Sequence, residues 1–147
     1  DVTSQFIEDG LVLYQIDAKG NRRNWGVKSG GKALDIPMVV LVNEFSASAS
    51  EVFTGAIIDN DRATVIGTTT FGKGSVTNLW PLRDGSGVNF TTARWFTPNG
   101  SFIEGQGLTP DIVLEPLAED ENEDLYLDRA IEILKEELNA NSQAKNR

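Results

Sequence analysis

The sequence predicts a mixed α/β domain, and three observations indicate this class. Residues 38–42 are an unbroken apolar run, a helical pattern follows them, and residues 63–66 are a second apolar run. This order of strand, helix and strand is typical of a βαβ unit. Two pairs of extended segments flank the unit, and a glycine-containing turn joins each pair, which indicates β-hairpins. An amphipathic helical pattern covers residues 125–138.

The N-terminal part predicts a helix end followed by a hairpin. Residues 2–7 have the pattern of a last helical turn, with Gly10 as the stop signal. Residues 11–16 and 22–27 read as two extended segments joined by a turn, so they predict a hairpin. Residues 38–42 lack any polar alternation, which predicts a strand that helices bury on both faces.

A helix is predicted directly after a serine-rich segment, residues 45–51. Glu51 follows Ser48 by three residues, which is the spacing of a capping box at a helix start. The helix should end near residues 59–61. Its apolar positions are Val52, Phe53, Ala56 and Ile57.

The second half predicts a loop, a hairpin and a helix. Residues 67–74 are rich in glycine and threonine, and residues 75–82 and 88–96 predict the hairpin. Short extended pieces follow around residues 101–103 and 111–114.

The predicted C-terminal helix is amphipathic. Its apolar positions are Leu127, Ala130, Ile131, Leu134 and Leu138. The acidic residues 119–124 are interpreted as a solvated helix start. Residues 139–147 are polar, so fraying is expected there.

The composition indicates one globular domain, residues 1–147. The hydrophobic fraction is 39% and the charged fraction 24%, which are ordinary values for such a domain. The formal net charge of −9 argues against nucleic acid or an anionic membrane as partner, because both attract a basic surface. The chain begins with Asp1 rather than Met, so we expect a piece of a longer protein.

The sequence contains neither cysteine nor histidine. The lack of cysteine excludes disulfides and a cysteine nucleophile. The lack of histidine excludes the Ser-His-Asp triad and nearly every catalytic zinc site. Nucleophilic catalysis would therefore need another base, with lysine as the leading candidate. We expect no metal and no cofactor.

Ser48 is a candidate nucleophile. A serine after a buried strand, at a helix N-terminus, lies at the edge of a sheet, where free N–H groups and the helix dipole can stabilise an oxyanion. The structural alternative is a helix N-cap. By these arguments alone, Ser46 and Ser50 are equally plausible.

Lys73 is the candidate base, because it lies between Gly72 and Gly74 in the predicted loop. The two glycines allow a tight turn that could direct the lysine inward. A lysine packed among apolar groups loses hydration, which favours its neutral, basic form. The structural alternative is an exposed loop lysine. The residue order of a phosphate-binding loop is not matched.

Together these segments resemble a known family. Residues 45–51 and 70–76 are similar to the two signature blocks of the carboxyl-terminal processing (tail-specific) proteases, which are serine peptidases with a Ser-Lys dyad. Lys73 follows Ser48 by 25 residues, which is the family's spacing.

The resemblance continues through residues 91–100 and 103–111. It covers about residues 36–113, and less clearly residues 1–35, with several motifs in the family's order.

The resemblance implies a role for each site residue. Ser48 would be the nucleophile, Lys73 the general base and the Ala49 backbone N–H an oxyanion donor. The enzyme would be a serine endopeptidase that cleaves proteins near their C-termini.

One position departs from the family pattern. Thr77 stands where members commonly have a glutamine that helps orient the lysine, and its hydroxyl is shorter and offers no amide N–H. Three interpretations follow: Thr77 substitutes weakly for the glutamine, Asn78 reaches in through a local shift, or the dyad works without a third member. Strand alternation argues against Asn78, because adjacent residues face opposite sides of a strand. We also predict that Gly72 and Gly74 contact substrate.

The resemblance further implies a fold and a setting. The fold would be the ClpP/crotonase-like spiral of ββα units. The chain would be an N-terminally truncated protease core without the PDZ domain and the upstream oxyanion block. Its partners would be proteins or peptides with apolar C-termini, and exposed apolar surface would favour self-association of the fragment. The location would be extracytoplasmic, in the periplasm or cell envelope, with a membrane-anchored parent.

Two other functions are compatible with the fold. One is a catalytically impaired relative that acts as a peptide-binding or scaffold domain. The other is an acyl-CoA enzyme, which the Phe-Gly-Lys-Gly loop and the lack of an evident basic surface argue against. Trp25, Trp80 and Trp95 are interpreted as core or hairpin packing, with a substrate groove as the alternative for Trp80.

Overall fold

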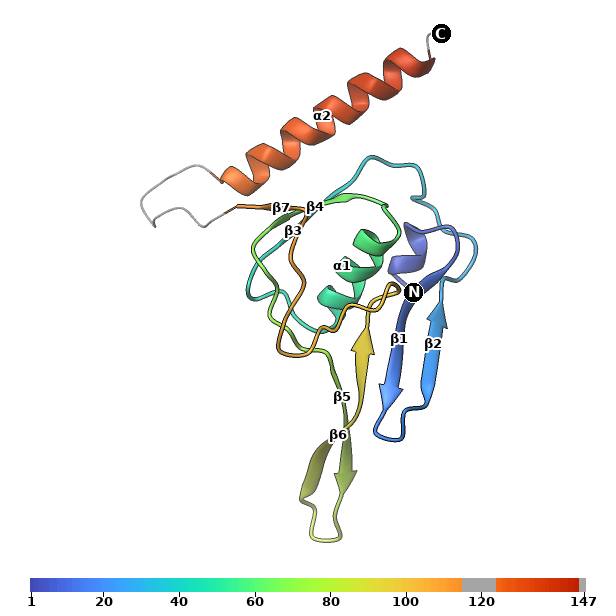
Figure 1. Ribbon diagram of the computed structural model, residues 1–147, viewed down its shortest axis with the longest axis vertical. Coiled ribbons are helices and arrows are strands. Elements are labelled where there is room, and N and C mark those ends of the chain that lie inside the picture. The colour runs from blue at the N-terminus through green and yellow to red at the C-terminus, as the bar shows by residue number, and fades with distance from the viewer. Residues whose placement is uncertain (115–123, 146–147) are drawn as a thin grey trace.

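The computed structural model describes residues 1–114 and 124–145, and it confirms the mixed α/β class (Figure 1). The strands are β1 (Leu11–Asp17), β2 (Arg22–Gly26), β3 (Val39–Val42), β4 (Thr64–Gly67), β5 (Ser75–Pro81), β6 (Gly87–Phe96) and β7 (Ile112–Val113). The helical segments are the 3₁₀ turn η1 (Thr3–Gln5) and the α-helices α1 (Ala49–Asp59) and α2 (Leu125–Lys145). The described strands form an antiparallel sheet in the order β2-β1-β6-β5 and a parallel sheet in the order β3-β4-β7.

Helices lie on both faces of the parallel sheet, as the apolar run of β3 predicted, although Leu41 of β3 remains 43% exposed. The α1 side contains Ile7, Val42, Ala56, Ile57 and Val65. The α2 side contains Ile66, Ala130 and Ile133. In Figure 1 the two helices lie on opposite sides of this sheet. The predicted βαβ unit is therefore confirmed as β3-α1-β4, and residues 43–48 form the loop that leads from β3 to the start of α1.

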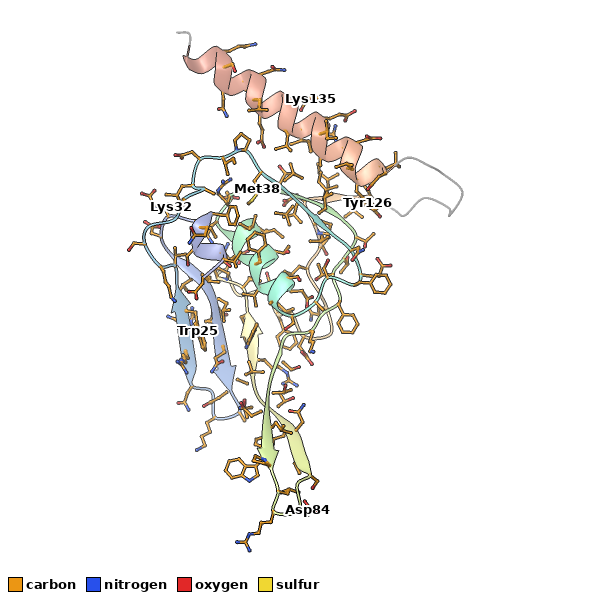
Figure 2. All side chains as sticks on the ribbon, turned by 180° about the vertical axis from the view of Figure 1, so that it is seen from behind. Trp25, Lys32, Met38, Asp84, Tyr126 and Lys135 are labelled. Atoms are coloured by element: carbon orange, nitrogen blue, oxygen red, sulfur yellow. The ribbon has the colours of Figure 1, made fainter. Side chains whose placement is uncertain are left out.

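The two predicted hairpins are β1–β2 and β5–β6. The β5–β6 hairpin projects away from the body of the molecule, and Figure 2 shows Asp84 at its far end. Its exposed apolar side chains are Leu79, Trp80, Leu82, Val88 and Phe90. Trp80 is 65% exposed, so the interpretation of its side chain as packed is wrong.

Two predicted helix boundaries are wrong. Residues 2–7 contain only η1. Phe6 N–H donates at 3.0 Å to the carbonyl of Thr3, three residues earlier, which is the 3₁₀ pattern; an α-helix would join residues four apart. The helix α2 continues to Lys145 rather than ending near residue 138. Residues 139–143 are exposed, and no Gly or Pro interrupts the helix.

The acidic residues 119–123 lie outside the described residues. No helix within residues 1–114 and 124–145 has the length and apolar character needed to cross a membrane.

Arg62 connects the segment before β3 to the rest of the domain. Its guanidinium donates to the carbonyls of Phe6, Ala33 and Ile36 at 2.7, 2.8 and 2.7 Å. Lysine cannot make this fork of bonds. We therefore expect Arg62→Lys to lower the free energy of unfolding by about 2 kcal/mol, as measured by urea denaturation. The control is Arg83→Lys on the exposed hairpin turn, which should change little. Equal midpoints for the two variants would contradict this role.

Candidate active site

Ser48 is the N-cap of α1 and has an unusual backbone conformation. Its φ is 57° and its ψ is −110°, a region that residues with a Cβ rarely adopt. The loop before it is held by hydrogen bonds to Asn43. Phe45 N–H donates to the Asn43 side chain at 3.1 Å, and Ser46 N–H donates to the Asn43 carbonyl at 2.9 Å. Strained residues of this kind cluster at functional sites, so the geometry favours Ser48 as a reactive position.

The three candidate serines now differ. The Ser46 hydroxyl accepts a hydrogen bond from Asn43 N–H at 3.1 Å, so it caps its own loop. Ser50 lies exposed in the first turn of α1. Ser48 alone among the three has a positive φ. Its role as nucleophile remains a prediction, but the other two serines have no comparable backbone feature.

Ala49 is the first residue of α1, and its N–H has no acceptor among the described residues. A free amide at a helix N-terminus carries the positive end of the helix dipole. Its role as an oxyanion donor stays a prediction.

The lysine loop, residues 68–74, connects β4 to β5 and contacts the serine loop. Phe71 N–H donates to the Ser46 carbonyl at 2.9 Å. Thr70 is buried, and its N–H donates to the Leu108 carbonyl at 3.1 Å. The βαβ unit therefore brings together two loops that are distant in sequence.

The glycines beside Lys73 are required by the backbone, as predicted. Gly72 has a φ of +89°, and a Cβ on Gly74 would lie 2.5 Å from the Glu104 backbone nitrogen. Gly72 N–H donates within the protein, to Glu51, and its carbonyl accepts a hydrogen bond from Gly105. The predicted contact of these glycines with substrate stays a prediction.

Lys73 is exposed, which differs from the expected packing among apolar groups. Its backbone N–H points inward and donates to Glu51 Oε2 at 2.8 Å, while its side chain extends toward solvent. Among the described residues no hydrogen bond joins Lys73 Nζ to Ser48 Oγ. Such bonds are often long in unliganded enzymes and shorten when substrate binds.

Glu51 is a site residue whose full role the sequence did not reveal. Its side chain is completely buried, with 0% exposure. Oε1 accepts hydrogen bonds from Thr70 Oγ1 and Gly72 N–H, both at 2.6 Å. Oε2 accepts from Ser48 N–H and Lys73 N–H, both at 2.8 Å. The capping-box spacing predicted the bond to Ser48, but nothing local in the sequence indicated the other three.

Thr77 lies exposed on β5 beside a register shift in the hairpin. Its side chain has no hydrogen bond to any described residue, so its relation to Lys73 stays open to test. The Asn78 amide donates to Thr92 Oγ1 at 2.9 Å across the hairpin. Asn78 is therefore already engaged with a residue other than the lysine.

A cavity of about 740 Å³ lies beside the start of α1. Its apolar lining includes Trp25, Val40, Ala49, Val52, Phe53 and Trp95, and its polar lining includes Ser46, Ser50 and Thr54. Trp25 and Trp95 thus line this cavity, whereas Trp80 is not part of its lining. No group of metal-binding side chains occurs within the part of the chain that the structure describes.

Comparison of the sequence with known proteins indicates the family of this chain. The sequence model of Peptidase family S41 matches residues 1–114. A carboxy-terminal-processing protease of Bartonella bacilliformis is 43% identical over 123 residues, which cover 80% of this chain and 28% of that protein. A probable CtpA-like serine protease of Staphylococcus aureus is 48% identical over 114 residues, which cover 75% of this chain and 23% of that protein.

A solved structure is similar to this chain in both fold and sequence. The photosystem II D1 C-terminal processing protease superposes with a TM-score of 0.73 at 39% identity, over 78% of this chain and 30% of that one. This chain therefore spans about a quarter of the length of the curated relatives it matches. Because the family model covers most of the chain and several relatives share over a third of their aligned residues, this chain belongs to peptidase family S41.

Proposed function

We propose that the whole protein is a serine endopeptidase that cleaves protein substrates near their C-termini, with an acyl-enzyme on Ser48 and Lys73 as general base. The observation that carries this proposal is the conformation of Ser48, a positive-φ residue at the start of α1 whose loop is hydrogen-bonded to the loop of Lys73. The family membership and the names of the relatives support it.

The reaction proceeds in two stages. Neutral Lys73 Nζ accepts the Ser48 Oγ proton as Oγ attacks the carbonyl carbon of the scissile peptide bond. The free Ala49 N–H donates to the resulting oxyanion. Lys73 then gives its proton to the leaving amine as the C–N bond breaks. Water attacks the acyl-enzyme while Lys73 accepts its proton, and the acid product leaves as Ser48 recovers a proton.

The nature of the cavity supports an apolar substrate. It opens beside Ala49 and Ser50, and its wall includes Val40, Phe53 and Trp95. Apolar side chains of a bound polypeptide gain free energy when they leave water for such a surface. Proteins or peptides with apolar C-termini are thus the proposed substrates, and an extracytoplasmic location belongs to the same proposal.

The test is to trap the acyl-enzyme. The whole protein is mixed with a peptidyl p-nitrophenyl ester whose acyl residue is apolar, quenched in acid and analysed by mass spectrometry. We expect one acyl group, located on Ser48, and a burst of p-nitrophenol. An acyl group on a different residue would overturn the proposal. Saturable peptide binding without acylation would instead favour the scaffold alternative.

A second experiment tests Lys73 as the general base. Lys73→Ala should slow acylation by about 10²–10⁴-fold, the usual contribution of a positioned general base. Stopped-flow measurement of the burst gives the rate. Lys32→Ala is the matched control, because Lys32 is also an exposed lysine in a loop. Equal acylation rates for the two variants would exclude Lys73 as the base.

A further inference from the structure

We infer that Glu51 is the positioning residue of the reactive pair, an inference that rests on the proposed function. Its carboxylate sets the position of Ser48 relative to Lys73 through hydrogen bonds to both backbones. Glu51 itself neither contacts substrate nor exchanges protons. It acts by holding the two loops that carry the reacting side chains.

The two reactive residues meet on a single oxygen atom. Ser48 N–H and Lys73 N–H each donate to Glu51 Oε2 at 2.8 Å. The two residues are 25 positions apart in sequence, and no hydrogen bond joins them directly among the described residues. The separation of their backbones therefore depends on this oxygen.

The second oxygen holds the lysine loop from the other side. Thr70 Oγ1 and Gly72 N–H donate to Oε1, both at 2.6 Å. Thr70 Oγ1 in turn accepts a hydrogen bond from Leu108 N–H at 2.8 Å. The carboxylate thus connects the serine loop, the lysine loop and the segment around Leu108 into one network.

The site is built for a carboxylate rather than an amide. A buried carboxylate is tolerated only when donors satisfy it, and here four donors surround it at the positive end of α1. Glutamine has the same size, but its NH₂ group would replace one oxygen and face two donors. Aspartate keeps both oxygens, but it is one methylene shorter and cannot hold both loops where they are.

The conformation of Ser48 depends on the same contact. Rotation about its N–Cα bond defines φ, which is 57°, and the bond from its N–H to Oε2 restrains that rotation. Loss of the bond lets Ser48 relax toward a negative φ, which re-aims Oγ. Misplacement of a reacting group by about 1 Å can cost about 10²-fold in rate.

The experiment is a kinetic comparison in the whole protein. With an internally quenched peptide that ends in apolar residues, Glu51→Gln is expected to lower kcat by about 10²-fold. KM should change little, because the cavity beside α1 is untouched. Glu51→Asp, which retains the charge, should recover only part of the loss.

The control separates positioning from stability. Asn60 caps the opposite end of the same helix, where its amide donates to the Ala56 carbonyl at 2.7 Å. Asn60→Ala should lower the thermal midpoint yet keep kcat close to that of the unchanged protein. Ser48→Ala and Lys73→Ala in the same assay test the proposed function separately. If both keep kcat, that function is wrong; if both lose it while Glu51→Gln keeps it, only this inference is wrong.

Three further outcomes test the positioning role of Glu51. The two variants Glu51→Gln and Asn60→Ala are compared when their thermal midpoints are the same. If kcat of Glu51→Gln falls no further than kcat of Asn60→Ala, Glu51 has only a structural role. If neither Glu51 variant folds, its role is to hold the fold and the inference is overturned. A folded Glu51→Gln protein with lower kcat and unchanged KM supports it.

Discussion

Replacement of Ser48 by alanine is expected to lower kcat of the whole protein by about 10⁴-fold or more, because the substitution removes the proposed nucleophilic atom. The backbone contacts of the site survive the change. Alanine still donates its N–H to Glu51 Oε2, a bond of 2.8 Å in the structure. The fold should therefore persist, which circular dichroism can verify while peptide turnover is measured.

The neighbouring serines provide controls for this experiment. Ser50→Ala removes an exposed hydroxyl at the second residue of α1, and Ser46→Ala removes a loop cap that accepts from Asn43 N–H. Both variants should retain most of kcat, whereas KM can change, because both residues line the cavity beside α1. Residual activity in Ser48→Ala that matches that of Ser50→Ala would show that the nucleophile lies elsewhere.

Replacement of Gly67 by alanine should unfold the domain or cost more than about 4 kcal/mol of stability. Gly67 ends β4 with a φ of +139°, and an added Cβ would lie 1.7 Å from the Val42 carbonyl oxygen. Hydrogen bonds hold the backbone at both Val42 and Gly67, so neither segment can move away to relieve the clash. The Val42 carbonyl accepts from Thr68 N–H at 3.2 Å, and Leu114 N–H donates to the Gly67 carbonyl at 2.9 Å. Urea denaturation measures the loss in the free energy of unfolding.

A second glycine with positive φ isolates the effect of the clash. Gly85 at the hairpin turn has a φ of +88°, yet nothing lies within 4 Å of an added Cβ. Gly85→Ala should thus cost only the backbone strain, about 1–2 kcal/mol. Similar losses for the two variants would mean that the contact with Val42 can relax.

The local pattern of residues was enough to predict most of the architecture. The apolar runs around Val40 and Val65 predicted β3 and β4, because an unbroken apolar run is visible in the sequence itself. The helix between them was predicted from Ser48, Glu51 and the apolar spacing that follows, since capping is a contact over three residues. The order and spacing of motifs likewise indicated the family and the pair Ser48 and Lys73.

Contacts between distant segments decided the rest. Glu51 accepts hydrogen bonds from Thr70 and Lys73, which lie 19 and 22 residues away in sequence, and only the folded βαβ unit brings those donors to one buried carboxylate. Lys73 is exposed in the structure, and the glycines on either side of it did not indicate this. Backbone preference and apolar periodicity act over a few residues, whereas hydrogen-bond partners and burial depend on which loops the completed sheet places side by side.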